Sequence, residues 1–379
     1  MEYNKKNPLR CFFSFEGYNS QGLALNRIKK YYPDFDCVCV GRSEIDKYAI
    51  LAADALFPDA KNKNYGDIRM IDWDNVPDFD LFTMSSPCQD FSNAGLRKGG
   101  AEGSGTRSSL LWECRRAISS KMPKYILFEN VKGLMSYKFL PYFRKWQNEL
   151  ASFGYSNFAK VINAKDFGIP QNRERIFMIS ILDENASYHF PEPFLLTKRI
   201  KDVLEQNVDE KFYLKASQID YIYSTSKNGI KRIGAHDMDD VANTIISTCF
   251  KGDYMNCIKE PVACAMRGRN PEKPSDRKTG LHTEQRLEIG CPVCNTITSV
   301  QKDSLILEQN FKIRKLSPRE TLRLMDVDDE DIDKIFAIGI SNTQIYRMGG
   351  NSIVVSCLYH IFRKLFIEKE NENKQLTLF

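Results

Sequence analysis

Three stretches of the sequence decide the fold: DLFTMSSPCQ (residues 80–89), KYILFENV (124–131) and RIFMISIL (175–182). Each holds a short apolar run, and two runs of the same form come earlier, LRCFFSF (9–15) and CVCVGRSE (37–44). Continuous apolar runs separated by helix-sized connections indicate a parallel sheet that is covered by helices on both faces. The sequence therefore predicts an α/β fold built on a mostly parallel, twisted sheet.

Polar residues follow these runs at the places where such a sheet binds its ligands. In open parallel sheets, ligands bind beyond the carboxyl ends of the strands. We therefore expect the functional residues to come directly after the apolar runs. The residues at these places are Glu16–Gly17, Glu44, Asp67, Pro87–Gln89 and Glu129–Asn130.

Length and composition set broad limits on the protein. A chain of 379 residues is typical of one large domain with a smaller one. The formal net charge of +5 permits a polyanionic partner but does not require one. The eleven cysteines are scattered, and no signal peptide or membrane-length apolar stretch is present. We therefore expect a cytoplasmic protein with free thiols and no membrane contact.

The character of the sequence changes near residues 189–191. From there to residue 310 the pattern is weaker and rich in turns, and AMRGRNPEKPSDRKTG (265–280) has the composition of an exposed loop. We predict one domain from residues 1–190 together with 311–367, and a smaller, irregular domain from 191–310. The charged residues 368–374 are expected to be disordered.

Three groups of residues offer chemistry, and each has a plainer interpretation. Cys88 follows a buried strand and is suited to be a nucleophile, although most lone cysteines are structural. Glu129 ends the next run and is placed for general acid chemistry, unless it is simply solvated. Arg173 and Arg175 present two guanidinium forks to one substrate, or form a surface charge cluster.

Taken together and in this order, PCQ (87–89), ENV (129–131) and QxRxR (171–175) resemble the signature motifs of the bacterial and phage DNA (cytosine-5)-methyltransferase family. The resemblance continues in FEGYN (15–19), which is similar to the FxGxG cofactor loop of the family. Asn19 replaces its second glycine, and asparagine tolerates positive φ better than other non-glycine residues. Further matches are Glu44–Asp46, Gly66–Ile68, Arg314–Glu320 and Gly350–Ser352.

The resemblance implies a catalytic mechanism. The Cys88 thiolate adds to carbon 6 of cytosine, Glu129 assists at N3, and Arg175 with Arg173 holds the base carbonyl oxygen and orients Glu129. The methyl group comes from S-adenosylmethionine. A stacked base is out of reach, so the target cytosine must be flipped out, at a cost of about a few kcal/mol.

The resemblance also implies binding roles. The glycine-rich stretch 95–108 is expected to close over double-stranded DNA. The residues expected to contact DNA next to the nucleophile are Gln89, Arg97, Lys98 and Arg107. The expected fold is a Rossmann-like S-adenosylmethionine-dependent methyltransferase domain. Its expected cofactor-binding residues are Phe15, Gly17, Asn19, Glu44, Ile45, Asp67, Ile68, Pro87, Leu110, Asn351 and Ser352.

Residues 191–310 are interpreted as the target-recognition domain. Arg267, Arg269, Arg277 and Lys278 are candidates for contacts with base edges, although a solvated loop explains them equally well. Cys291 and Cys294 form one CxxC pair near His282, which falls short of the four ligands of a structural zinc site. We therefore expect no metal.

Two other functions remain open at this stage. One is a tRNA cytosine methyltransferase of the same fold, which the long 191–310 region disfavours. The other is a DNA-binding protein whose catalytic site has decayed, which the presence of Cys88, Glu129 and Arg175 disfavours. We expect a monomer. The terminal peptide Gln375–Phe379 resembles the motif that binds the bacterial β sliding clamp, unless its apolar side chains dock on their own domain.

Overall fold

A computed structural model describes residues 2–86, 107–215, 217, 235–247, 256–269, 284–289 and 305–368, without the side chains of 107–109, 260–269, 284–289 and 305–311. The chain divides into two compact units. The first comprises Met1–Lys198, Asn243–Lys251 and Pro318–Phe379, and the second comprises Arg199–Ala242 and Gly252–Ser317. The sequence predicts these boundaries at residues 190 and 310, with residues 243–251 in the smaller domain.

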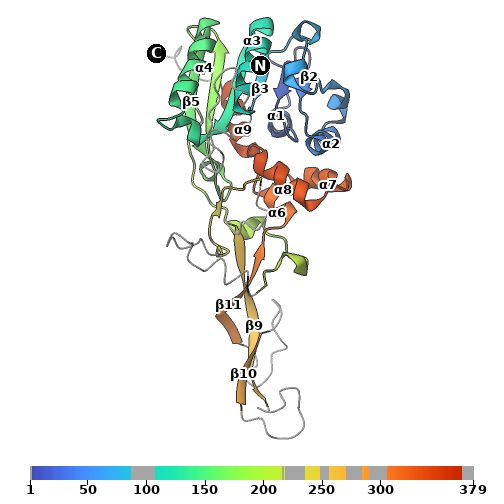
Figure 1. The fold of residues 1–379 in the computed structure, drawn as a ribbon, viewed down its shortest axis with the longest axis vertical. Coiled ribbons are helices and arrows are strands. Elements are labelled where there is room, and N and C mark those ends of the chain that lie inside the picture. Colours follow the sequence, from blue (N-terminus) through green and yellow to red (C-terminus); the bar gives the residue numbers. More distant parts are fainter. Residues whose placement is uncertain are drawn as a thin grey trace. The chain divides into compact units, whose positions relative to one another are not determined.

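A six-stranded sheet with the order β2-β1-β3-β4-β7-β5 forms the centre of the first unit (Figure 1). The first four strands of this order are parallel, which confirms the predicted mostly parallel sheet. The strands are β1 (Leu9–Ser14), β2 (Cys37–Ser43), β3 (Leu81–Met84), β4 (Tyr125–Val131), β5 (Tyr155–Asn163) and β7 (Glu174–Leu182).

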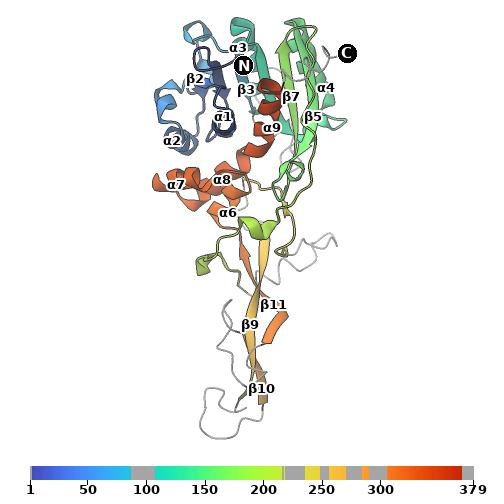
Figure 2. The same ribbon diagram turned by 180° about the vertical axis from the view of Figure 1, so that it is seen from behind.

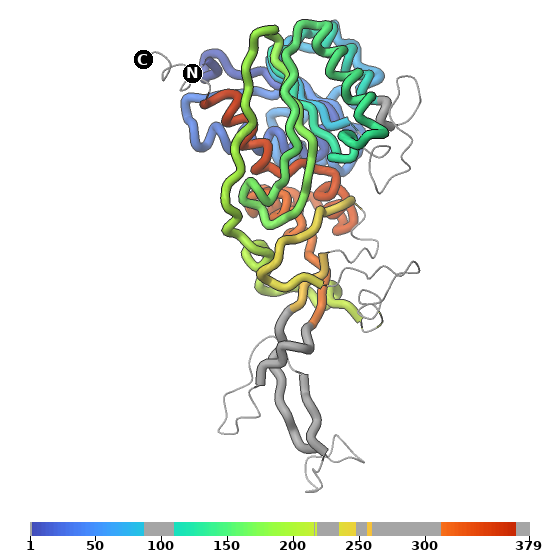
Figure 3. Tube along the Cα trace, turned by 90° about the vertical axis from the view of Figure 1, so that its left-hand side faces the viewer, coloured from blue at the N-terminus to red at the C-terminus, as the bar shows by residue number. Residues whose placement is uncertain are grey.

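The run 175–182 is the exception to the predicted pattern. We expected it to be a further parallel strand, but β7 is antiparallel to both β4 and β5. Figure 3 shows β5 and β7 running side by side. Only about ten residues join them, with no crossover helix, and parallel neighbours need a longer connection. The short connection therefore forces the chain to return antiparallel.

Helices cover both faces of the sheet. On one face, α3 and α4 pack with inward side chains such as Phe82, Ile126 and Phe128 (Figure 1). On the other face, α1 and α9 pack with Cys11, Leu81 and others (Figure 2). The α-helices are α1 (Ser20–Tyr31), α2 (Lys47–Leu56), α3 (Cys114–Lys121), α4 (Leu140–Ser152), α6 (Pro318–Arg323), α7 (Asp329–Ala337), α8 (Asn342–Asn351) and α9 (Val355–Phe366).

Short 3-10 helices occupy several connections of both units. They are η1 (Pro58–Lys63), η2 (Ile68–Met70), η3 (Trp73–Asn75), η4 (Arg107–Glu113), η5 (Lys132–Met135), η6 (Ala164–Phe167), η7 (Ile200–Val203) and η8 (Glu210–Phe212). A two-stranded sheet joins β6 (Gln171–Asn172) and β8 (Ala242–Asn243). Among the described residues, no helix is long and apolar enough to cross a membrane.

The second unit contains a three-stranded antiparallel sheet with the order β10-β9-β11. Its strands are β9 (Cys257–Arg269), β10 (Glu284–Ile289) and β11 (Leu305–Lys315). We expected residues 265–280 to be a loop, but residues 265–269 belong to β9. Pairing with β10, in which Arg267 lies opposite Arg286, extends β9 through these residues. Their sequence is charged and contains a glycine, so it gives no local sign of a strand.

Candidate active site

The loop between β1 and α1 has an unusual backbone. Phe15, Gly17 and Asn19 have φ values of 52°, 60° and 67°, in the left-handed region. The prediction that Asn19 tolerates positive φ is confirmed. Its side chain also accepts a hydrogen bond from the Gly22 amide at 2.7 Å and so caps α1. The loop therefore turns sharply at the carboxyl end of β1, directly into the helix.

Glu44 fixes this loop to the end of β2. Its carboxylate accepts hydrogen bonds from the backbone amides of Gly17, Ile45 and Asp46, at 2.9, 2.8 and 2.9 Å. A carboxylate offers about four acceptor positions, so capacity remains for a ligand hydroxyl. Next to it, the Ile45 side chain is 69% exposed. A polar acceptor beside an exposed apolar surface suits a nucleoside, which has a ribose diol and an apolar base.

A buried charge cluster lies behind the loop. Arg42, which is 1% exposed, donates hydrogen bonds to Glu16 at 2.9 Å, to Asp54, and to the backbone carbonyls of Ala60 and Lys61. The second oxygen of Glu16 has no hydrogen-bond partner among the described residues. Burial raises the pKa of Glu16 to about 8, although the Arg42 charge opposes this shift. The cluster joins the cofactor loop to β2, α2 and η1.

The turn before β3 contributes the third part of the predicted cofactor site. Asp67 forms an ion pair with Arg69 at 2.5 Å, and this contact lowers the pKa of Asp67. Ile68 is buried. Asn64 accepts from the Glu44 and Gly66 amides at 3.1 Å each, which connects this turn to the end of β2. A Cβ atom placed on Gly17 or Gly66 would meet no atom of the described residues within 4 Å.

Glu129 and Arg175 meet at the carboxyl end of β4. The Arg175 Nε lies 3.3 Å from a Glu129 carboxylate oxygen, because Arg175 pairs with Val131 across β4 and β7. Glu129 is 8% exposed, and burial raises its pKa while the charges of Arg175 and Arg173 lower it. The neighbouring Asn130 donates to the carbonyl of Ser86 at 3.2 Å. This bond joins the ends of β3 and β4.

The structure gives Arg173 surroundings unlike those of Arg175. The expectation that both arginines present guanidinium forks to one substrate is wrong for Arg173. Its guanidinium is 3% exposed and donates to the backbone carbonyls of Ile245, Gly350 and Ser352, at 2.6, 3.0 and 2.6 Å. Arg173 lies directly before β7, and its side chain points into the protein interior, where these three carbonyls accept its hydrogen bonds. Its charge still reaches Glu129, whose pKa it lowers.

The remaining predicted residues fall into three groups. Asn351 is exposed at the end of α8, Ser352 is buried, and Leu110 is half-buried in η4. Arg107 begins η4, and Arg267 and Arg269 lie on β9, without described side chains. Predicted residues outside the described part of the chain are Pro87, Cys88, Gln89, Arg97, Lys98, Arg277, Lys278, the Cys291–Cys294 pair with His282, and Gln375–Phe379.

Sequence reasoning missed several residues that shape the site. Arg42 and Asn64 carried no recognisable signal, because their partners lie on other elements. Tyr18, inside the cofactor loop, bonds through its hydroxyl to Ser352 at 2.7 Å, across 334 residues of sequence. The described residues contain no group of three or more His, Cys, Asp or Glu side chains that would hold a metal ion.

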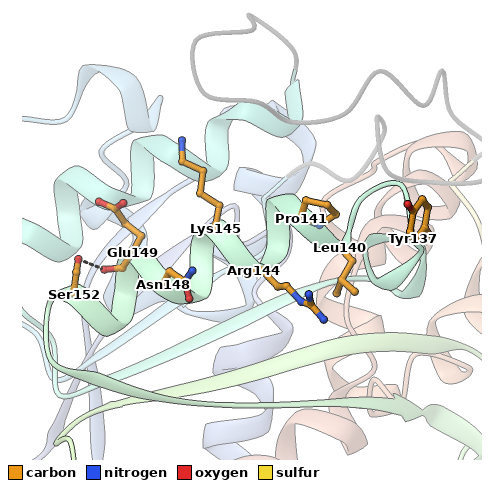
Figure 4. A pocket seen from close by; sticks show the side chains of 8 residues that line it. All are labelled: Tyr137, Leu140, Pro141, Arg144, Lys145, Asn148, Glu149 and Ser152. Carbon is orange, nitrogen blue, oxygen red and sulfur yellow. Dashed lines mark hydrogen bonds between the residues drawn. The ribbon is translucent and has the colours of Figure 1, made fainter.

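A surface hollow of about 740 Å³ lies along α4 (Figure 4). Arg144 and Lys145 on the helix and Tyr137 before it are among its lining residues. Neither Glu129 nor Glu44 lines it. We therefore place the active site at the strand ends and not in this hollow.

The mostly parallel sheet with helices on both faces defines the class of the fold, a Rossmann-like α/β domain. The chain belongs to the C-5 cytosine-specific DNA methylase family, whose sequence profile matches residues 14–367. It is therefore an enzyme of the DNA (cytosine-5-)-methyltransferase class, as the sequence motifs predicted.

Individual relatives support this assignment. The type II methyltransferase M2.ScrFI of Lactococcus lactis subsp. cremoris is 40% identical over 312 residues, which cover 80% of this chain and 71% of the relative. The orphan methyltransferase M.SPRI of Bacillus phage SPR is 29% identical over 96% of this chain and 99% of its own length.

Solved structures share the fold at low sequence identity. The Entamoeba histolytica methyltransferase EhMeth superposes with a TM-score of 0.66 at 17% identity, covering 95% of this chain and 98% of that one. The S. pombe Dnmt2 methyltransferase gives a TM-score of 0.62 at 16% identity, covering 96% and 99%.

Proposed function

We propose that the chain transfers a methyl group from S-adenosylmethionine to carbon 5 of a flipped-out cytosine in a specific duplex DNA sequence, through a covalent Cys88 intermediate. The observation that carries the proposal is the junction of β3 and β4. There Glu129 is paired with Arg175, and Asn130 holds the carbonyl of Ser86, two residues before Cys88. The buried carboxyl group of Glu129 is thus tied to the strand end from which the chain continues, two residues later in the sequence, to Cys88.

The chemistry of cytosine requires both groups. Carbon 5 is a poor nucleophile until a thiolate adds to carbon 6 and pushes electron density toward it. In the proposed step, the Cys88 sulfur forms a bond to carbon 6 while Glu129 donates a proton to N3. Burial favours the protonated form of Glu129, and Arg175 fixes its direction. After methyl transfer, which leaves S-adenosylhomocysteine, carbon 5 loses its proton to solvent. The bond between Cys88 and carbon 6 breaks with its electron pair returning to sulfur, and N3 returns its proton to Glu129.

The cofactor residues fit S-adenosylmethionine, which supplies an electrophilic methyl group when bound. Glu44 accepts from the ribose hydroxyls, and Ile45 with Phe15 packs on the adenine. Asp67 accepts from the adenine amine. Pro87, Leu110 and Asn351 are assigned to the methionine end. The other residues assigned to the cofactor site are Gly17, Asn19, Ile68 and Ser352.

The second unit is assigned to sequence recognition. Arginine on guanine edges is the commonest specific contact in the major groove, and β9 carries Arg267 and Arg269. Arg277 and Lys278 follow in the sequence, and Gln89, Arg97, Lys98 and Arg107 are assigned to the DNA around the flipped base. The enzyme is proposed to act as a cytoplasmic, nucleoid-associated monomer.

The test begins with the target sequence, which methylome sequencing of a methylation-free bacterial host expressing the chain will give. A duplex with 5-fluorocytosine at the target position is then incubated with the protein and S-adenosylmethionine. Fluorine does not leave as a proton does, so elimination stalls and an adduct that resists denaturation should accumulate.

The adduct should need both S-adenosylmethionine and Cys88. Cys39→Ser, on β2, is the matched cysteine control and should still form it. An adduct that survives in Cys88→Ser would identify another nucleophile. A parallel incubation with tRNA separates the two substrates: methylation of tRNA and not of duplex DNA would reject the DNA assignment.

We also propose a protein partner for the terminal peptide Gln375–Phe379. Leu376, Leu378 and Phe379 are apolar anchors that follow a charged run, a composition suited to a short motif bound by the β sliding clamp. A clamp tether would raise the local enzyme concentration on newly replicated DNA. Binding to purified clamp should be lost in a chain that ends at Lys374, while methylation of free DNA persists. Equal binding by both chains, or by neither, would reject the tether.

A further inference from the structure

Arg173 joins three segments that are far apart in the sequence. Its backbone amide donates to Asn163 at 3.0 Å, at the end of β5. Its guanidinium donates to Gly350 and Ser352, at the end of α8, and to Ile245. All three carbonyl acceptors belong to the first unit. Because a buried carbonyl without a hydrogen-bond donor is destabilising, the positions of these segments depend on one another.

The Ser352 end of this connection leads to the cofactor loop. The Tyr18 and Ser352 hydroxyls are 2.7 Å apart and share a hydrogen bond, and Ser352 also donates to the Gly349 carbonyl at 2.9 Å. Tyr18 is fully buried between Gly17, whose amide is bound to Glu44, and Asn19. A displacement of the loop on cofactor binding therefore reaches Ser352 directly.

The Ile245 end leads to a segment that is tightly held. The Ile245 amide donates to the Gln171 side chain at 3.0 Å, and Thr244 donates to the Asn172 carbonyl at 2.7 Å. A Cβ atom on Gly350 would lie 2.2 Å from the Ser247 nitrogen, so any side chain at position 350 would collide with the backbone of the segment. On both sides the chain continues into the second unit, at Ala242 and at Gly252.

We propose that Arg173 is a positioning residue that couples the cofactor loop to the Asn243–Ser247 segment, so that cofactor binding and DNA binding strengthen each other. The proposal rests on the proposed cofactor and duplex substrate. A dense backbone packing of this kind transmits small displacements because it has little free space to absorb them. By thermodynamic linkage, the effect of cofactor on DNA affinity equals the effect of DNA on cofactor affinity.

The experiment measures the dissociation constant of the target duplex with and without saturating S-adenosylhomocysteine, and the reverse pair as a check of reciprocity. We expect the wild-type protein to bind the duplex at least about fivefold more tightly with S-adenosylhomocysteine, within the usual range of such couplings. Arg173→Lys keeps the charge but not the fork that reaches three carbonyls. It should reduce the coupling factor to about one.

Tyr18→Phe removes only the hydroxyl at the loop end of the connection. It should reduce the coupling about fivefold, which corresponds to about 1 kcal/mol, the value of one buried hydrogen bond. Tyr155→Phe is the matched control, because the Tyr155 hydroxyl is also buried and donates at 2.7 Å, to Pro123 at the far end of the sheet. It should leave the coupling factor unchanged.

Each outcome decides the proposal. Wild-type coupling that persists in Tyr18→Phe and Arg173→Lys overturns it, and Tyr18→Phe decides alone if Arg173→Lys fails to fold. Loss of coupling in the Tyr155→Phe control as well would show a general loosening of the fold and also overturn it. A wild-type protein that binds no S-adenosylhomocysteine refutes the proposed function itself. Binding of both ligands without coupling refutes the coupling alone.

Discussion

Replacing Glu16 by glutamine should change how the stability of the first unit depends on pH. Glu16 is buried beside Arg42, and its pKa is raised from 4.5 to about 8 because burial outweighs the attraction of the arginine. The folded protein therefore keeps this carboxyl protonated at pH values where the unfolded chain releases the proton. The stabilisation is complete below about pH 4.5 and is lost as the pH rises to about 8.

The size of the effect follows from the two pKa values. Each pKa unit is equivalent to about 1.4 kcal/mol, so the free energy of unfolding should fall by at most about 5 kcal/mol across this range. Glu16→Gln removes the titrating proton and keeps the acceptor for Arg42. Its amide faces a position without a described acceptor, which costs about 1–3 kcal/mol at all pH values. The variant should therefore lose less stability than the wild type as the pH rises.

Urea unfolding followed by tryptophan fluorescence measures this effect in the right unit, because Trp73, Trp112 and Trp146 all lie in the first unit. The difference in unfolding free energy between Glu16→Gln and wild type should rise by about 1.4 kcal/mol per pH unit inside the window. Glu2→Gln, at an exposed ion pair with Lys124, is the control and should run parallel to the wild type. Parallel curves for Glu16→Gln and wild type would refute the raised pKa.

Three further predictions concern the loop, the catalytic carboxyl group and the second unit. Asn19→Ala should lower the unfolding free energy by about 2–3 kcal/mol, because alanine disfavours positive φ and the helix cap is lost. Asn19→Gly should lower it by only a few tenths of a kcal/mol. Equal losses for the two variants in urea titrations would argue against an effect of φ. Glu129→Gln should lower kcat by about 10²- to 10⁴-fold and leave the binding of S-adenosylhomocysteine intact. The control variant Glu149→Gln, on α4, should leave kcat unchanged. A fully active Glu129→Gln protein would show that this residue takes no part in the mechanism. A chimera tests the role of the second unit: Arg199–Ala242 and Gly252–Ser317 are replaced by the corresponding regions of M2.ScrFI, and Asn243–Lys251 is kept. The chimera should methylate a different DNA sequence and retain methyl transfer. An active chimera that still methylates the original sequence would locate recognition elsewhere.

The sequence alone was enough for the features that depend on local patterns. Continuous apolar runs predicted the strands, because a strand buried on both faces has no polar side to show. The requirement for positive φ at Asn19 followed from its place in a motif and from the steric limits of its backbone. The pairing of Glu129 with Arg175 was expected from the family resemblance. The order of the motifs along the chain was therefore sufficient to predict the family and the edge of the sheet where the residues meet.

Only the tertiary structure decided which partners each side chain has. Nothing local distinguishes Arg173 from Arg175, yet one faces three buried carbonyls and the other faces Glu129. The direction of β7 depended on a connection that is too short for a crossover. The position of Asn243–Ser247 against α8 depended on residue 350 being glycine, which has no side chain. A hydrogen bond such as that of Tyr18 with Ser352 joins atoms 334 residues apart. Periodicity records which face of an element is buried, but the partner on that face is set by packing of the whole chain.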